Sequence, residues 1–243
     1  MTVFSPHHLF WLSLSVLFVG GCISMSRLGH DSRWHKVARV SLFGIVLLNE
    51  SAWFLYRHIA GGIAVVDNLP LHLCDMSVFL MLFTLATGNR RLAELSYYAG
   101  VTGALFAVFV PAISETGWIR PIAEIRYFVT HIALVGVGFY FTYGRGYHPR
   151  IGAALRSYIA VHLYAALITP INLYLDTNYF FTLSAPKVDF LQQYPHWLFL
   201  AVTSVAFFSF FALMHLPFVW LRRRLMAGPP SLSERGLEPT PRH

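Results

Sequence analysis

The chain has 243 residues, of which 56% are hydrophobic and only 12% are charged, and its mean hydropathy is +0.55. A water-soluble domain usually carries about 25% charged residues, so the composition indicates a protein surrounded by lipid. The formal net charge is +7. The basic residues lie in short polar segments between apolar stretches, however, and this excludes a nucleic-acid-binding protein.

Seven apolar stretches follow one another along the chain, each close to the roughly 20 residues that a membrane-spanning helix needs. They comprise residues 8–26, 37–58, 70–87, 93–113, 122–143, 151–173 and 195–221. The connections are short except the sixth, which runs from Tyr174 to Tyr194. We predict an all-α transmembrane domain of seven helices over residues 1–227. Residues 228–243 are rich in Pro, Ser and charge, and we expect them to form a disordered cytoplasmic tail.

Lysine and arginine are distributed unevenly between the two ends of the predicted helices. If the N-terminus lies outside, 14 of the 18 basic residues fall in cytoplasmic segments, and the other side holds only Arg57, Arg120, Arg126 and Lys187. The positive-inside rule therefore predicts an outside N-terminus and a cytoplasmic C-terminus. The first 26 residues contain no Lys or Arg, so the first stretch is interpreted as a helix rather than a cleaved signal peptide.

Polar side chains gather toward the predicted outer ends of four helices. Ionisable and amide groups within a membrane are costly, so each is a candidate for function. At a rise of 1.5 Å per residue, Glu50 and His131 lie roughly 12–13 Å below the outer helix ends and Cys74 about 6 Å below. The set of candidates is Asn49, Glu50, His72, Cys74, Asp75, Arg126, His131, Asn172, Asp176 and Asn178.

The third stretch opens with Pro70 and contains a cysteine between two polar residues. Proline suits the first turn of a helix, so the helix is expected to start there. His72 and Asp75 are three residues apart and share a face, whereas Cys74 points about 200° away from His72. A base for Cys74 must then come from another helix, and His131 lies at a compatible depth. A thiol near a helix N-terminus is favoured as thiolate, and a Cys–His pair suits acyl transfer.

Structural interpretations compete with these functional ones. A lone cysteine or histidine in a membrane helix is more often a packing residue, and Asn49 and Asn172 could only join helices by hydrogen bonds. Arg126 could extend to lipid head groups. A metal or haem site built from His72, Asp75 and His131 stays open, but no compact ligand motif supports it. We therefore predict no metal and no cofactor.

Two other classes of membrane protein are weighed against the sequence. A retinal protein needs a lysine within a helix, and Lys36 and Lys187 both lie in predicted loops, so this class is excluded. A secondary transporter would favour broken helices and inverted repeats, and neither is evident.

Three segments together resemble the YwaF-like integral membrane family of bacteria. The first is Leu69-Pro70-Leu71-His72-Leu73-Cys74, which is similar to that family's signature. The second is Arg126-Tyr127-Phe128-Val129-Thr130-His131, which holds the histidine of the fifth stretch. The third is Asn172-Leu173-Tyr174-Leu175-Asp176-Thr177-Asn178-Tyr179-Phe180-Phe181, after the sixth stretch. The resemblance extends from the second stretch to the seventh.

The YwaF-like family is related to eukaryotic transmembrane acyltransferases that move fatty acyl chains between phospholipids through a Cys–His pair. It is related more distantly to lipid hydrolases of the androgen-induced type, which use Thr in place of Cys. The resemblance implies that Cys74 is the nucleophile and His131 the general base. A thioester formed on Cys74 would then be released to a lysophospholipid.

The expected function is therefore that of an acyltransferase or lipid hydrolase in the bacterial cytoplasmic membrane, with phospholipids as its partners. One of three carboxylates would orient the base, and other polar residues would bind the phosphate or the ester carbonyl. The alternative is a non-catalytic carrier or sensor that holds a small amphipathic ligand in the same cavity. The residues expected to bind or orient are Glu50, Asp75 and Asp176 as the carboxylates, with His72, Arg126, Asn172 and Asn178.

Overall fold

The computed structural model describes residues 3–29, 32–60, 69–111, 113, 117–186 and 189–226. Within these residues the secondary structure is helical, without strands, as the composition predicts. The predicted disordered tail, residues 228–243, and Lys187 lie outside the described residues.

Nine α-helices are present in the described part of the chain. They are α1 (Pro6–Ser24), α2 (Arg33–Ala60), α3 (Leu73–Thr87), α4 (Arg90–Leu95), α5 (Val101–Phe109), α6 (Arg120–Phe139), α7 (Ala153–Leu175), α8 (Asp189–Gln192) and α9 (His196–Met226). A π-helical turn, Ser96–Gly100, joins α4 to α5, and a second one, Tyr140–Gly144, extends α6. Thus α4 and α5 form one continuous apolar segment.

Six helical segments of the described chain are long and apolar enough to cross a membrane: Pro6–Arg27, Arg33–Ile59, Arg90–Phe109, Gly117–Gly144, Ala153–Leu175 and His196–Arg223. The third predicted stretch forms α3, which is apolar but has only 15 residues. At 1.5 Å per residue it spans about 22 Å, less than the roughly 30 Å of a bilayer's hydrocarbon core. The structure therefore supports a multi-pass membrane protein in which α3 is the exceptional element.

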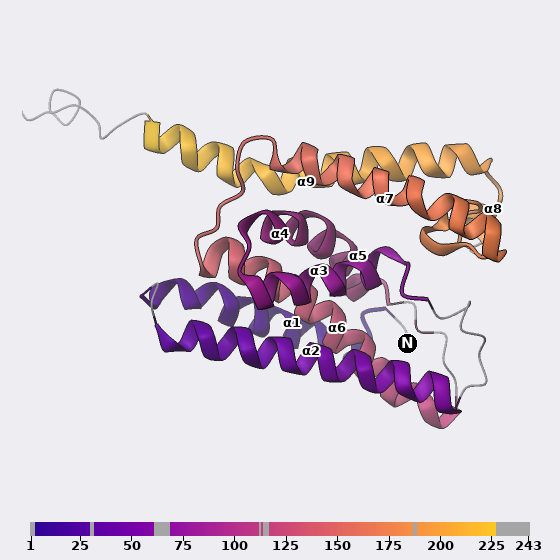
Figure 1. The fold of residues 1–243 in the computed structure, drawn as a ribbon, viewed down its shortest axis with the longest axis horizontal. Helices are drawn as coiled ribbons and strands as arrows, with labels where there is room; N and C mark the ends of the chain where they lie inside the picture. Colours follow the sequence, from indigo (N-terminus) through magenta and orange to yellow (C-terminus); the bar gives the residue numbers. More distant parts are fainter. Residues whose placement is uncertain are drawn as a thin grey trace, which may run out of the picture.

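The helices are arranged with α7 and α9 side by side along one edge and α1 and α2 at the other (Figure 1). Between them lie α3, α6 and the α4–α5 segment, which contact one another. The buried core is centred on these inner helices and includes Tyr98, Val101, Val137 and Tyr140. The close approach of α6 to α5 depends on Gly138, because a Cβ atom at this position would overlap the side chain of Val101.

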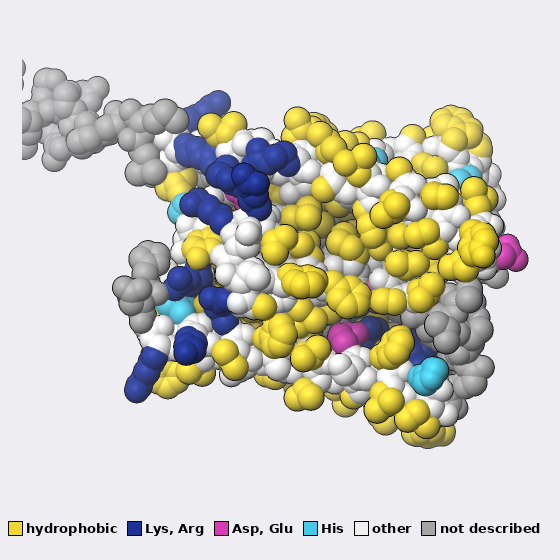
Figure 2. All heavy atoms as spheres, in the orientation of Figure 1, with side chains coloured by type: hydrophobic (Ala, Val, Ile, Leu, Met, Phe, Trp, Pro, Cys, Tyr) yellow, Lys and Arg dark blue, Asp and Glu magenta, His cyan; other side chains and the backbone are white. Residues whose placement is uncertain are grey.

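Charged and apolar side chains occupy different parts of the surface. Figure 2 shows Lys and Arg gathered mainly at one end of the molecule, whereas hydrophobic side chains cover much of the remaining face. The C-terminal end of α3 lies at this basic end, where Arg39 donates hydrogen bonds to the carbonyls of Leu85 and Ala86 at 2.6–2.9 Å. A cation at a helix C-terminus stabilises the exposed carbonyls. The N-terminus of α3 therefore lies toward the opposite end.

Candidate functional site

The N-terminus of α3 begins later than predicted. His72 is the N-cap residue and Leu73 the first helical residue, so Pro70 precedes the helix and does not lie in its first turn. The reason is a tertiary contact: the backbone N–H of Leu69 donates to the hydroxyl of Tyr179 at 3.0 Å. This bond holds the preceding segment outside the helix. Our prediction of a helix start at Pro70 is corrected accordingly.

Cys74 is consequently the second residue of α3. The backbone N–H groups of Leu73 and Cys74 have no acceptor among the described residues, as is usual in the first turn of a helix. On the facing helix α5, a Cβ atom added to Gly103 would lie 3.8 Å from Cys74 Sγ and 3.5 Å from Leu73 Cδ2. The thiol therefore lies beside a backbone without a side chain and next to free amide donors.

His131 is buried in α6 and is oriented by its own helix. Its Nδ1 atom donates to the carbonyl of Tyr127, one turn earlier, at 2.6 Å. With the proton on Nδ1, the neutral ring presents Nε2 as an acceptor. Nε2 makes no hydrogen bond to any described residue. A backbone carbonyl thus orients this ring, where the sequence analysis expected a carboxylate from Glu50, Asp75 or Asp176.

An ion network joins α2, α3 and α6 at this level. Arg126 Nη2 lies 2.5 Å from Glu50 Oε2 and 4.0 Å from Asp75 Oδ1. The hydroxyl of Thr130 donates to the other oxygen of Glu50, and the amide of Asn49 donates to Thr130 Oγ1 at 3.0 Å. Arg126 Nε is buried without a hydrogen-bond partner. The guanidinium is therefore held in place while one of its donors remains unused.

Cys74 precedes Asp75 and His131 follows Thr130, so both candidate residues adjoin this network, and Gly100 lies one turn further on, beside both helices. A Cβ atom added to Gly100 would lie 3.8 Å from Ser77 Cβ and 3.7 Å from Leu134 Cδ2. Ser77 and Leu134 each follow the two candidate residues by three positions. Along α3, Cys74 lies beside Gly103 and Ser77 beside Gly100, and along α6, Tyr127 donates to the carbonyl of Ala107 while Leu134 lies beside Gly100. Both helices therefore run opposite to α5 and parallel to each other. Cys74 and His131 therefore lie at a similar level of neighbouring helices, but no hydrogen bond joins them in the described chain.

Asn172 organises the loop that follows α7. Its side-chain amide donates to the carbonyl of Tyr179 at 2.8 Å and to Thr182 Oγ1 at 2.9 Å. Its Oδ1 accepts from the hydroxyl of Thr177 at 2.9 Å and from the backbone N–H of Tyr179 at 2.8 Å. The hydrogen-bonding capacity of this buried side chain is used within its own loop. Asn172 therefore has no amide atom left for a phosphate or an ester carbonyl.

Three other predicted site residues shape this loop or contact it. Asn178 bonds to the backbone and hydroxyl of Ser184 at 2.8–3.2 Å. Asp176 ends α7 in a left-handed conformation, with φ of 54°. His72 Nδ1 accepts from the backbone N–H of Phe180 at 3.3 Å. The loop thus holds the N-cap of α3, two residues before Cys74, against the end of α7.

Sequence reasoning missed several residues that build this region. Thr130 and Tyr127 were not singled out, although Tyr127 stands four residues before His131 and so lies one turn away on the same helix. Trp53 was missed as well: its ring lies 5.8 Å from the Arg126 guanidinium. The available signal was its position in an apolar helix, three residues after Glu50 and four before Arg57.

The predicted site residues neither cluster as metal ligands in the described chain nor line two open cavities at its basic end. Among the described residues, no group of three or more His, Cys, Asp or Glu side chains could hold a metal ion, so His72, Asp75 and His131 do not form a ligand cluster. Two open cavities, of about 600 and 570 Å³, lie at the basic end of the molecule. Cys74 and His131 line neither of them.

The helices and their apolar surfaces define a multi-pass α-helical membrane protein. The sequence model of the TMEM164 family matches residues 3–215, and the chain belongs to this family. The match includes every candidate site residue from Glu50 to Asn178. No curated protein and no solved structure matches the chain. The relation to YwaF-like bacterial proteins and to acyltransferases stays a prediction.

Proposed function

We propose that this protein is a phospholipid acyltransferase that uses the Cys74 thiol as nucleophile and His131 as general base. The observation that carries the proposal is the common level of a thiol and an imidazole on two neighbouring, parallel helices, with the acceptor nitrogen of the imidazole unoccupied. Nucleophile and base from different elements, with the base oriented by a third group, are the usual parts of covalent acyl transfer. Here the orienting group is the carbonyl of Tyr127.

The reaction proceeds in two halves. His131 Nε2 takes the proton of the Cys74 thiol as the sulfur attacks the ester carbonyl of a phospholipid. The carbon–oxygen ester bond breaks, the lysophospholipid leaves with the proton from His131, and the acyl chain remains as a thioester. A hydroxyl of a second lysophospholipid, deprotonated by His131, then attacks the thioester and releases the Cys74 thiolate, which recovers the proton. Water in place of that hydroxyl gives the hydrolase reaction.

The start of α3 supplies the groups that such a reaction needs at the carbonyl oxygen. In each half, this oxygen becomes negatively charged and is stabilised by donors that are already in place. The free backbone N–H groups of Leu73 and Cys74 are adjacent to the sulfur and belong to the positive end of the α3 dipole. The late helix start supports the proposal, because it brings these donors beside the thiol.

Arg126 is the group proposed to bind the lipid phosphate. Its unpartnered Nε is a donor suited to a phosphate oxygen, and guanidinium groups bind phosphates strongly. Glu50 and Asp75 both face Nη2 of Arg126 and would hold the guanidinium in place. They are positioning residues in this scheme, as are His72, Asn172, Asp176 and Asn178 in the adjoining loop.

The proposed orientation in the membrane follows from charge. We infer seven crossings, with α3 and its preceding segment forming the short third one, an outside N-terminus and a cytoplasmic C-terminus. The excess of basic residues at one end supports this orientation. Cys74 then faces the outer half of the bilayer, in a bacterial cytoplasmic membrane.

The test is acyl transfer by the purified chain in phosphatidylcholine vesicles that contain a lysophospholipid with a labelled head group. Wild type is expected to form labelled diacyl lipid, and Cys74→Ala and His131→Ala are expected to lose at least about 100-fold in rate. Cys22→Ala is the matched control, since it removes the other thiol of the chain, in α1. Transfer that persists in Cys74→Ala would refute the proposed nucleophile.

The second candidate is a non-catalytic carrier or sensor of a small amphipathic ligand. The observation in its favour is that no hydrogen bond joins Cys74 to His131 in the described chain. This candidate predicts that labelled lysophospholipid binds to the wild type and to Cys74→Ala equally, with no diacyl product from either. The vesicle assay therefore separates the two candidates directly.

A further inference from the structure

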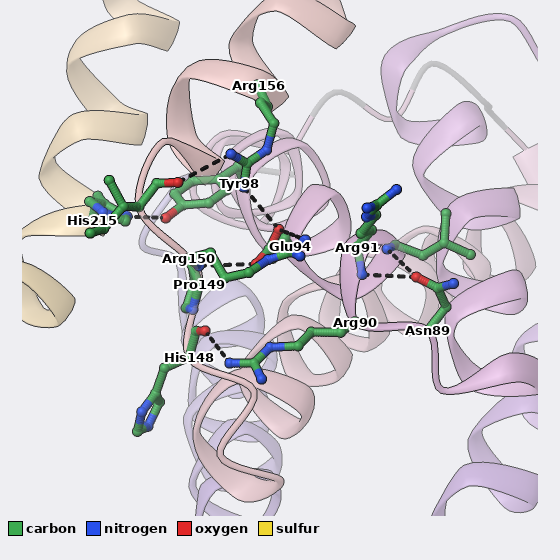
Figure 3. A network of polar contacts seen from close by, with 12 residues as sticks. Asn89, Arg90, Arg91, Glu94, Tyr98, His148, Pro149, Arg150, Arg156 and His215 are labelled. Carbon is green, nitrogen blue, oxygen red and sulfur yellow. Dashed lines mark hydrogen bonds and ion pairs between the residues drawn. The ribbon is translucent and has the colours of Figure 1, made fainter.

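An open cleft of about 570 Å³ lies where α4 meets α7 and the segment before α7. Its polar lining consists of Arg91, Glu94, Arg150, Arg156 and Ser157, and aliphatic side chains of the same helices complete its walls. Figure 3 shows Arg150 and Arg156 meeting Glu94 of α4, with Arg91 on the same helix beside them. None of these residues belongs to the proposed acyl-transfer site.

Glu94 fixes two of the arginines but does not neutralise the cleft. This carboxylate is buried and accepts from Arg150 Nε at 2.8 Å, from Arg150 Nη2 at 3.0 Å and from the Arg150 backbone N–H at 3.0 Å. Arg156 Nη2 lies 3.4 Å from its second oxygen. One negative charge therefore faces three positive ones, counting Arg91, and the cleft keeps an excess of positive charge.

Two donors in this cleft have no partner in the described chain. Ser157 is only 3% exposed, yet its hydroxyl makes no hydrogen bond to any described residue. The guanidinium of Arg91 is also without a hydrogen bond or ion pair there, since only its backbone N–H is bonded, to Asn89 Oδ1 at 2.8 Å. Both donors line the open cleft and are therefore available to a ligand.

The walls of the cleft are fixed by further arginines. Arg90 donates to the carbonyl of His148 at 2.9 Å (Figure 3). Arg222 donates to the carbonyl of Pro149. The pKa of His148 is lowered from its usual value by burial and by the charges of Arg90 and Arg222. The segment that carries Arg150 is thus held in place, and the local potential is positive.

We propose that this cleft binds the phosphate of an anionic phospholipid in the adjacent leaflet. The phosphate oxygens would accept from Arg91, Arg156 and Ser157, in the charge-assisted geometry that arginine and phosphate favour. A lipid is favoured over a soluble phosphate because the cleft opens between membrane-spanning helices, where the basic end meets the hydrophobic surface (Figure 2). Ile151, which lines the cleft, is 77% exposed and continues that apolar surface for the acyl chains. Basic clusters at the membrane surface attract anionic lipids in this way.

The test is native mass spectrometry of the full chain in detergent with equimolar phosphatidylglycerol and phosphatidylcholine of identical acyl chains. Wild type is expected to retain phosphatidylglycerol preferentially. Arg91→Gln should reduce that preference by about fivefold, the effect of one basic residue near the surface. Arg91 is exposed and has no side-chain partner in the described chain, so the substitution leaves the fold intact. Ser157→Ala should reduce the preference less.

Arg27→Gln is the matched control, because it removes the same charge from the basic end but lies outside the cleft. It should leave the preference for phosphatidylglycerol unchanged. Equal retention of the two lipids by wild type, or an equal loss in Arg27→Gln and Arg91→Gln, would overturn the site. Displacement of the lipid by millimolar glycerol phosphate would overturn the lipid assignment and identify a soluble phosphate as the ligand. Failure here leaves the acyl-transfer proposal intact, since the readout is binding at a separate cleft.

Discussion

Helices α6 and α7 each contain a tyrosine four residues before a histidine, and the two pairs have the same local structure. Nδ1 of His131 donates to the carbonyl of Tyr127 at 2.6 Å, and Nδ1 of His162 donates to the carbonyl of Tyr158 at 2.9 Å. The ring centroids of the two pairs are 4.2 and 4.1 Å apart. Each helix alone therefore sets the ring orientation and places the available lone pair on Nε2.

The neighbouring helix makes the two histidines different. Nε2 of His162 accepts from the hydroxyl of Ser204 in α9 at 2.9 Å, and the Tyr158 hydroxyl lies 2.5 Å from the same oxygen. Nε2 of His131 has no such partner in the described chain. The same spacing thus gives a histidine hydrogen-bonded between two helices in α7 and a histidine with a free Nε2 in α6. Helix spacing sets the orientation of each ring, whereas the facing helix determines whether Nε2 has a hydrogen-bond partner.

The largest expected effect comes from replacing the two histidines in turn. His131→Ala should lower the acyl-transfer rate by about 10²–10⁴-fold, the usual contribution of a general base. His162→Ala should keep most of the rate, because its ring is already occupied by Ser204. Initial rates in vesicles, normalised to folded protein, measure both. If His162→Ala lowered the acyl-transfer rate as much as His131→Ala, the two histidines would not differ in role.

The ion network beside His131 has no counterpart beside His162, and breaking it should cost stability. Glu50→Gln leaves Arg126 without its closest partner and should lower the free energy of unfolding by about 3 kcal/mol, the lower end for a buried pair. About a fifth of each side chain remains exposed (20% and 23%). Thermal unfolding in detergent measures the loss. The double variant Glu50→Gln/Arg126→Met should recover part of it, and strict additivity of the two single losses would contradict the pairing.

The hydrogen bonds that join His162 and Tyr158 of α7 to Ser204 of α9 should contribute less to the free energy of unfolding. Ser204→Ala removes the hydroxyl that joins His162 and Tyr158 to α9. Hydrogen bonds between membrane helices contribute about 0.6 kcal/mol on average, with about 1.7 as the upper end, so the thermal transition should fall slightly. The acyl-transfer rate should stay as in wild type. A rate reduced tenfold or more would make Ser204 part of the chemistry and remove the distinction between the two histidines.

The smallest expected effect is that of Gly103→Ala, on the helix that faces Cys74. The added methyl group would lie 3.8 Å from the sulfur, an ordinary van der Waals contact, and alanine favours a helix by up to about 1 kcal/mol over glycine. Stability should rise slightly and transfer should persist. Gly103→Leu should instead block the thiol without unfolding the chain. Equal transfer rates in Gly103→Leu and wild type would show that the reactive surface of Cys74 does not face α5.

Much of the architecture could be predicted because burial in lipid imposes length and apolarity on each helix. The exception, α3, begins three residues late because the Tyr179 hydroxyl, distant in sequence, holds Leu69 outside the helix. No pattern local to Pro70 contains that information. Of the predicted site residues, Glu50, Asp75 and Arg126 meet across three helices, and their membership of a functional site stays a prediction.

The roles within the site were harder to predict than its members. Carboxylates were the natural candidates to orient His131, but every residue carries a carbonyl, and only the i–4 geometry shows that Tyr127 provides one. Asn172 similarly has the chemistry of a ligand, yet its loop uses both ends of the amide. Glu94 was overlooked because a carboxylate near a helix end among arginines is usually exposed, and here it is buried.

The most direct test of the central claim is detection of the acyl-enzyme on Cys74. The purified chain is incubated with phosphatidylcholine, quenched in acid and examined by intact-mass and peptide mass spectrometry, with and without hydroxylamine, which cleaves thioesters. We predict a mass increase of one acyl chain on the Cys74 peptide, removed by hydroxylamine, absent in Cys74→Ala and strongly reduced in His131→Ala. Diacyl lipid formed at the wild-type rate without any acyl group on Cys74 would contradict the mechanism.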